Sequence, residues 1–301
     1  MCLSNQCSFL ASYDEGSIVS GFYVNENIFF EESFNKNISY NIPIGCTTKE
    51  KGIIAKAKEV DGIMGLGNNN KSFIDILYNT NVIKRNIFSL CFSHEGGYFS
   101  IGKIDITYHF SQNINYVNLI DSNYQYLVKL NYIQVGDTKI EYNGRASIDS
   151  GSTFTNFPNK IFKKIMKKYL KICKNCGNLK RIEEYGYCAK VKDEDEMNEI
   201  ANEWKDIIIV LDDYKFIWKP ENYYFIYEKE EDELYLCLGF VGKDIEKIVL
   251  GITFMNGFDI IFDKEKFRIG IVPADCERNH IIIGEENDNN NTIENLENQD
   301  L

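Results

Sequence analysis

The segment Ala146-Ser147-Ile148-Asp149-Ser150-Gly151-Ser152-Thr153 constrains the fold of this chain more than any other. Apolar residues that run into Asp-Ser-Gly-Ser predict a strand that ends in a tight turn and presents a carboxylate there. Gly151 has no Cβ, so backbone can pass close by, and the hydroxyls of Ser150 and Ser152 can hydrogen-bond the carboxylate. Asp-Ser-Gly alone also forms ordinary β-turns, so other segments of the chain must show whether this motif is catalytic.

A single carboxylate in such a turn cannot act as the base and as the acid of one reaction, so a second carboxylate is needed beside it. Two carboxyl groups a few ångströms apart share one proton and hold a water; one activates this water and the other donates to the scissile carbonyl. The chain contains a single Asp-Ser/Thr-Gly, at Asp149. The sequence therefore predicts one half of such a pair.

Composition limits the domain organisation, the partners and the cysteine chemistry that this chain can have. A chain of 301 residues can form one large domain or two lobes, and its net charge of −12 argues against a nucleic acid or an anionic membrane as the main partner. Nine scattered cysteines favour disulfides formed in a secretory compartment. The lone Cys173-Lys174-Asn175-Cys176 has no matching pair and no nearby histidine, so it gives little support to a zinc site or to thioredoxin-like chemistry. No metal or cofactor is expected.

The pattern of apolar residues predicts a mainly β fold with few helices. Most of the first 150 residues form short β-branched or aromatic runs separated by Gly and Asn. Helices are predicted from Ser72 to Tyr78, from Pro158 to Leu170 with a lysine face, and from Lys192 to Trp204. Strands resume at Ile207 and continue to Leu238.

Several further segments join Asp149, and together they resemble the pepsin-like aspartic proteases over nearly the whole chain to Cys276. Val60 to Gly67 is similar to the hydrophobic-hydrophobic-Gly segment of the N-terminal lobe in that family, and Ile248 to Phe254 is similar to the same element of the C-terminal lobe. Ile260 to Gly270 resembles the closing strands. The cysteines are typical of the cysteine-rich, nepenthesin-like branch.

This resemblance implies a bilobal fold that is mainly β, with few short helices and an incomplete N-terminal lobe. A partial N-terminal lobe with a flap is expected at 1–120, a C-terminal lobe at 121–276 and a disordered acidic tail at 277–301. Cys7 to Ser17 is similar to the flap hairpin, which makes Tyr13 the flap tyrosine; the alternative is a strand-end aromatic beside a turn. A disulfide between Cys188 and Cys237 is implied in the same way.

The implied activity is that of an aspartic endopeptidase that acts through a two-aspartate activated water. Asp149 is then the second catalytic aspartate, the first is expected upstream of Met1, and Tyr13, Gly151 and Ser152 contact a polypeptide substrate. A monomer in the secretory pathway is expected, without nucleic acid, and with a membrane only if a terminal anchor exists. The alternative is a catalytically inactive, peptide-binding relative. A homodimeric protease with one aspartate from each chain is disfavoured, because this chain already carries the elements of two lobes.

Overall fold

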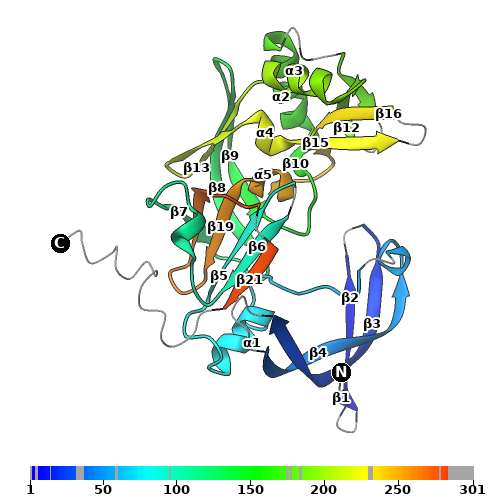
Figure 1. Ribbon diagram of the computed structural model, residues 1–301, viewed down its shortest axis with the longest axis vertical. Helices are drawn as coiled ribbons and strands as arrows, with labels where there is room; N and C mark the ends of the chain where they lie inside the picture. The colour runs from blue at the N-terminus through cyan, green and yellow to red at the C-terminus, as the bar shows by residue number, and fades with distance from the viewer. Residues whose placement is uncertain are drawn as a thin grey trace, which may run out of the picture.

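The computed structural model describes residues 2–3, 6–13, 15–31, 37–57, 60–94, 96–173, 176, 178–182, 185–229, 233–277 and 279–283. These residues form a mainly β molecule in which two small sheets flank a large one (Figure 1). The first small sheet has the order β1-β2-β3-β4 and is antiparallel throughout. Its strands are β1 (Cys2–Leu3), β2 (Gln6–Ser12), β3 (Ile18–Glu31) and β4 (Asn37–Lys51).

The large sheet has 13 strands and connects the two parts of the molecule seen in Figure 1. Its order is β17-β10-β18-β9-β8-β7-β20-β19-β5-β6-β21, and β13 joins it by pairing with β8 and β14. The strands are β5 (Ile87–Phe92), β6 (Gly97–Ile101), β7 (Asn115–Ile120), β8 (Tyr126–Val135), β9 (Thr138–Ile148), β10 (Thr155–Pro158), β13 (Ile207–Leu211), β14 (Tyr214–Trp218), β17 (Phe240–Lys243), β18 (Ile248–Leu250), β19 (Phe258–Asp263), β20 (Arg268–Pro273) and β21 (Asn279–Ile283).

The second small sheet and most of the helices lie in the upper part of Figure 1. This sheet has the order β11-β12-β16-β15, with β11 (Lys180–Ile182), β12 (Gly186–Val191), β15 (Tyr224–Lys229) and β16 (Glu233–Leu238). The helices are α1 (Phe73–Asn79), α2 (Asn159–Ile172), α3 (Glu194–Glu203), α4 (Pro220–Tyr223) and α5 (Ile252–Met255), with 3₁₀ turns η1 (Ile54–Lys56) and η2 (Ile106–Tyr108). Among the described residues, no helix is both long and apolar enough to span a bilayer.

The helix predictions from sequence are close to the structure, and the caps explain the boundaries. Ser72 is the N-cap of α1 and forms a capping box with Asp75, so the helix proper begins one residue later than predicted. Asp193 is the N-cap of α3, and its side chain accepts from the Glu196 amide at 2.9 Å. Pro158 was placed at the first helical position, but it is the N-cap residue of α2.

Part of the segment that was predicted to be a disordered tail forms a strand. Residues 279–283, which were assigned to a disordered tail, form β21 and pair in parallel with β6. The run Ile281-Ile282-Ile283 has high strand propensity, and the edge of β6 supplies the partner that strand formation requires. The acidic segment 284–301 lies outside the described residues.

One continuous core joins the strands of the large sheet to α1, α2 and α5, and it includes fully buried Trp218, Tyr169 and Tyr223. The Tyr169 and Tyr223 hydroxyls lie 2.8 Å apart, and burial raises the pKa of both side chains. By contrast, the β1–β4 sheet leaves Leu10 and Phe22 on one face 72% and 40% exposed. That face lacks a covering layer among the described residues.

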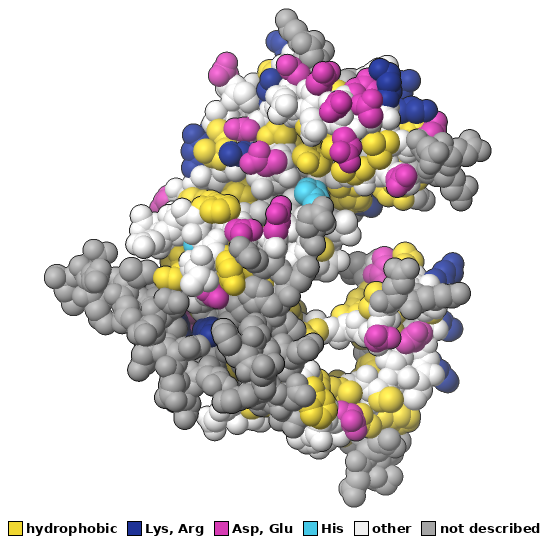
Figure 2. Space-filling model, in the orientation of Figure 1, with side chains coloured by type: hydrophobic (Ala, Val, Ile, Leu, Met, Phe, Trp, Pro, Cys, Tyr) yellow, Lys and Arg dark blue, Asp and Glu magenta, His cyan; other side chains and the backbone are white. Residues whose placement is uncertain are grey.

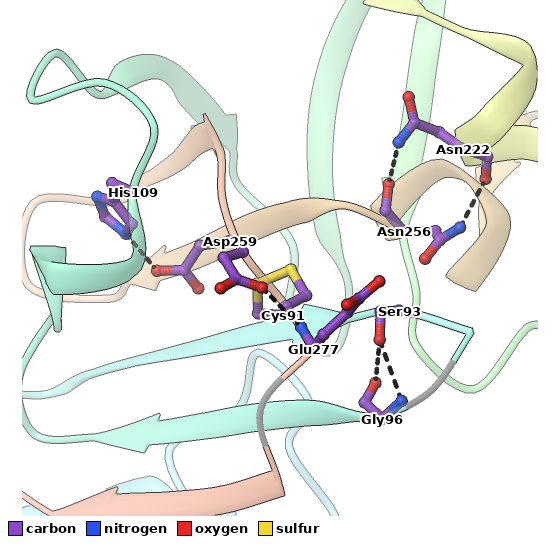
Figure 3. The surroundings of a disulfide bond; sticks show 10 residues. Cys91, Ser93, Gly96, His109, Asn222, Asn256, Asp259 and Glu277 are labelled. Atoms are coloured by element: carbon purple, nitrogen blue, oxygen red, sulfur yellow. Dashed lines mark hydrogen bonds and ion pairs between the residues drawn. A yellow bond between two sulfur atoms is a disulfide. The ribbon is translucent and has the colours of Figure 1, made fainter.

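Disulfides join distant parts of the described chain. Cys188 is bonded to Cys237, which confirms the predicted pair, and Cys91 is bonded to Cys276. Figure 3 shows the second bond beside the buried Asp259, whose Oδ2 lies 2.8 Å from His109 Nε2. The third bond links Cys173 and Cys176. Both of these cysteines are buried, and Cys173 is the C-cap residue of α2.

Candidate active site

Asp149 stands at the end of β9, where two neighbouring strands hold the backbone. β8 pairs with β9 in the antiparallel direction, and β18 pairs with it in parallel, with Leu250 opposite Ile148. The Asp149 amide donates to the Leu250 carbonyl at 3.0 Å. Ala146 and Ile148 are buried, so a register shift would move them to the wrong face. The position of Asp149 therefore follows from the pairing of β9.

The turn after β9 orients the carboxylate of Asp149. The Gly151 amide donates to Oδ1 at 2.9 Å, and the Ser152 hydroxyl donates to Oδ2 at 3.1 Å. A Cβ on Gly151 would lie 3.1 Å from Oδ1, so glycine leaves space for the carboxylate itself. Asp149 is exposed. The carboxylate is thus accessible to a ligand while each of its oxygens accepts one hydrogen bond from its own turn.

The segment that begins at β18 supports the same turn from the other side. The Ile252 amide donates to the Ser152 carbonyl at 2.8 Å, and the Thr253 amide donates to the Thr153 carbonyl at 3.2 Å. A Cβ on Gly251 would overlap the Ser152 carbonyl oxygen. Sequence analysis placed the close backbone approach at Gly151, but the structure places it at Gly251.

Thr253 also supports the Asp149 turn, and the sequence did not identify it as a site residue. Its Oγ1 donates to the Gly239 carbonyl at 2.6 Å and accepts from the Thr155 amide at 3.0 Å. Thr253 thereby connects β10, α5 and the residue before β17. The only available signal was that Thr253 follows the Leu250-Gly251 pair, because its two partners are distant in sequence.

Tyr13 lies in the hairpin turn between β2 and β3, a position that fits both the flap interpretation and the alternative of a strand-end aromatic beside a turn. Its amide donates to the Ser17 carbonyl at 2.9 Å, and Gly16 with φ +92° allows the turn to close. Buried Ser17 accepts from the Ile53 and Ile54 amides, which anchors this end of the sheet. No hydrogen bond or ring contact among the described residues joins Tyr13 to the Asp149 turn. The structure brings Asp149, Gly151 and Ser152 together, and it leaves Tyr13 on a separate sheet.

The molecular surface is hollowed between the β1–β4 sheet and the body that carries β15 and β16 (Figure 2). Segment 60–67, which is neither helix nor strand, is followed by a turn at 68–71 and then by α1. Within it, Val60, Ile63 and Met64 are 60%, 56% and 45% exposed, whereas Ile248 and Leu250 in β18 are fully buried. The two segments have similar sequences, but only β18 pairs with a strand that carries a carboxylate.

Metal chemistry finds no support in the part of the chain that the structure describes. No group of three or more His, Cys, Asp or Glu side chains there has an arrangement that could hold a metal ion. The arrangement around Asp149 instead offers an exposed carboxylate on a rigid turn. Such a group can accept a proton from water or hydrogen-bond a carbonyl.

Comparison with known proteins decides the family. A family model described as eukaryotic aspartyl protease matches residues 2–274. The chain belongs to this family. Plasmepsin V of Plasmodium falciparum is 26% identical over 92% of this chain and 60% of its own length. Aspartic protease 5 of Toxoplasma gondii is 22% identical over 90% of this chain and 28% of its own.

Mouse cathepsin D is also similar, at 24% identity over 90% of this chain and 67% of its own length. The chain spans less than two thirds of the plasmepsin V that it matches. Membership of the aspartyl protease family, the mainly β fold and the disulfides agree with the sequence analysis.

Proposed function

We propose that this protein is an aspartic endopeptidase that hydrolyses peptide bonds with a water activated between two carboxylates, one of which is Asp149. One observation carries the proposal: the Asp149 carboxylate is exposed, yet its turn is fixed by Gly151, Ser152 and the β18 segment. A preorganised carboxylate that needs no rearrangement is what general acid–base catalysis requires. Family membership supports the same activity.

The second carboxylate, in this proposal, arrives on a strand that pairs with residues 60–66. Support comes from the internal comparison, since the similar segment β18 is buried by its parallel pairing with β9. Exposed Val60, Ile63 and Met64 would be covered in the same way. The two carboxylates would then face each other and share one proton.

Gly151, Ser152 and Tyr13 have proposed roles in holding a polypeptide substrate. Gly151 and Ser152 lie beside the carboxylate, where the substrate backbone would pass. Tyr13 lies at the hairpin turn between β2 and β3, and would close over bound substrate. The disulfides and the similarity to plasmepsin V support a place in the secretory pathway.

Replacing Asp149 by Asn in the natural protein tests the proposal. The change preserves shape but removes the shared proton, so we expect peptide cleavage to fall at least about a hundredfold while the fold is retained. Cleavage is measured with fluorescence-quenched peptides, and the fold is checked by circular dichroism. Exposed Asp137, in the turn between β8 and β9, supplies the control Asp137→Asn, which should cleave normally.

Undiminished cleavage by Asp149→Asn would refute the catalytic assignment. A wild-type protein that binds these peptides but never cleaves them would instead favour the inactive, peptide-binding relative. The single Asp-Ser-Gly of the chain is the observation that keeps this second function in consideration.

A further inference from the structure

Five aromatic side chains form a continuous row that begins in the Asp149 turn and crosses the β15–β16 sheet. Neighbouring ring centroids along the row lie 4.8, 6.2, 4.1 and 6.0 Å apart. All five side chains are partly exposed. In spatial order, the aromatic row consists of Phe154, Phe225, Tyr185, Tyr227 and Tyr235.

Strand geometry places three of these rings on one face of the β15–β16 pair. Phe225 and Tyr227 are two residues apart on β15, and Tyr235 lies directly opposite Tyr227 on β16. Phe225 lies opposite Cys237, which is bonded to Cys188 on β12. The disulfide therefore ties β16, which carries Tyr235, to β12.

Phe154 connects the row to the proposed catalytic turn. It is five residues beyond Asp149, and its carbonyl oxygen is one of the atoms that a Cβ on Gly251 would overlap. At the far end, the Tyr235 hydroxyl donates to Glu233 Oε2 at 3.0 Å, and Glu233 pairs with Lys190. The row thus runs from the catalytic turn to a charged edge of the sheet.

Figure 2 shows hydrophobic side chains gathered on the body that carries β15 and β16, above the hollow. Partly exposed rings that stack on one another retain faces that can bind further apolar groups. Such a surface next to a site marks a place for a ligand. Its continuity with the Asp149 turn identifies the ligand as polypeptide substrate.

The row is long enough for several residues of an extended peptide. Side chains on one side of an extended chain recur every two residues, which is about 6.7 Å. The steps of 4.1–6.2 Å between rings are all shorter than this repeat, so alternate side chains of a peptide would lie along the row without matching it ring for ring. Consecutive apolar residues would point to opposite sides, and only half of them could reach the row.

We propose that the aromatic row binds an extended stretch of substrate that carries apolar side chains at alternate positions, away from the bond that is cut. This inference rests on the proposed endopeptidase function. It assigns Tyr185 and Tyr227, whose rings stack at 4.1 Å, as the centre of the surface that determines specificity. Binding there adds affinity without taking part in the reaction.

The test measures binding, so that it does not depend on catalysis. Two fluorescein-labelled peptides of identical composition, flanked by lysines, carry four phenylalanines either at alternate positions or consecutively, with serine elsewhere. Fluorescence anisotropy should show that the alternating peptide binds at least tenfold more tightly. The double variant Tyr185→Ala/Tyr227→Ala should lose that advantage, and Tyr227→Leu should lose part of it.

Tyr124→Ala is the matched control, because Tyr124 is 73% exposed and lies outside the row. It should bind both peptides as the wild type does. Equal binding of the two peptides, or a full advantage retained by the well-folded double variant, would overturn the proposal. Preferential binding without Asp149-dependent cleavage would refute the proposed function alone, and Asp149-dependent cleavage without preferential binding would refute the aromatic row alone.

Discussion

At the scale of single residues, Asp75 shows how a buried carboxylate remains ionised in this fold. Its Oδ2 lies 2.6 Å from Lys264 Nζ, and the two side chains are 5% and 8% exposed. Burial acts to raise the pKa of Asp75, but hydrogen bonds from Lys264, Ser72 and Asn86 outweigh it and hold the pKa below its ordinary value. The pair connects α1 to the end of β19, because Lys264 immediately follows that strand.

Asp75→Asn should therefore destabilise the protein in a pH-dependent manner. Because the pKa is lower in the folded state, the carboxylate stabilises the fold above its unfolded pKa, and this contribution disappears as the pH falls through the folded pKa. We expect a loss of about 3–5 kcal/mol at pH 7, where Lys264 is left unpaired, and a smaller loss below about pH 4. Urea unfolding at pH 7 and pH 3 measures both; exposed Asp121→Asn is the control, and a loss independent of pH would contradict the account.

Within the Asp149 turn, the contacting residues are close in sequence, and this explains which site residues could be predicted. Gly151 and Ser152 contact Asp149 across two and three residues, so the motif alone indicates their proximity. Thr253 and Gly239 support the same region from far along the chain, and nothing in their local sequence indicates this. Long-range pairing of strands decides such contacts, and local propensity does not.

At the scale of elements, α2 combines a buried apolar face with an opposite face that carries six lysines. Ile165 and Tyr169 are fully buried, and the helix packs against β8, β9, β10 and β17. None of the lysines of α2 forms an ion pair among the described residues. The lysines of this face are Lys160, Lys163, Lys164, Lys167, Lys168 and Lys171.

Lys164→Glu should stabilise the protein. It replaces like-charge repulsion with attraction to Lys160 and Lys168 one turn away, and each such pair is worth about 0.2–0.5 kcal/mol. We expect a gain of about 1 kcal/mol in the free energy of unfolding, measured in urea at low salt. Lys164→Gln should give about half of this gain, and 1 M NaCl should reduce both. A gain that is insensitive to salt would argue against an electrostatic origin.

Two segments of similar sequence, Val60–Gly67 and β18, adopt different structures. Both have the hydrophobic-hydrophobic-Gly pattern, and the sequence predicted the same role for each. Only β18 becomes a buried strand, because β9 and β10 lie on either side of it. A strand requires partners for its backbone groups, and the pattern of apolar residues does not reveal whether partners are present.

At the scale of the whole molecule, two disulfides close loops of very different size. Cys91–Cys276 joins residues 185 positions apart, and Cys188–Cys237 joins residues 49 apart. The chain-entropy model gives about 5 and about 4 kcal/mol of stabilisation for these loops, respectively.

Replacing both cysteines of a pair by serine tests whether the disulfide that closes the larger loop stabilises the protein more. The Cys91→Ser/Cys276→Ser variant should lose more stability than Cys188→Ser/Cys237→Ser, by roughly 1 kcal/mol, because it frees a larger loop in the unfolded chain. Urea unfolding under non-reducing conditions measures the difference, with Cys46→Ser as the control because Cys46 is exposed and free. The reverse order would show that local packing outweighs loop entropy.

The sequence by itself determined the mainly β class, the three longer helices within two residues, the carboxylate turn at Asp149 and the family, because each depends on local patterns. The tertiary structure decided that Gly251 is the point of close approach, that Val60–Gly67 remains exposed, and that five distant rings form one row. These features arise where segments far apart in sequence meet. Their energies come from pairing and packing between partners, and no single segment contains that information.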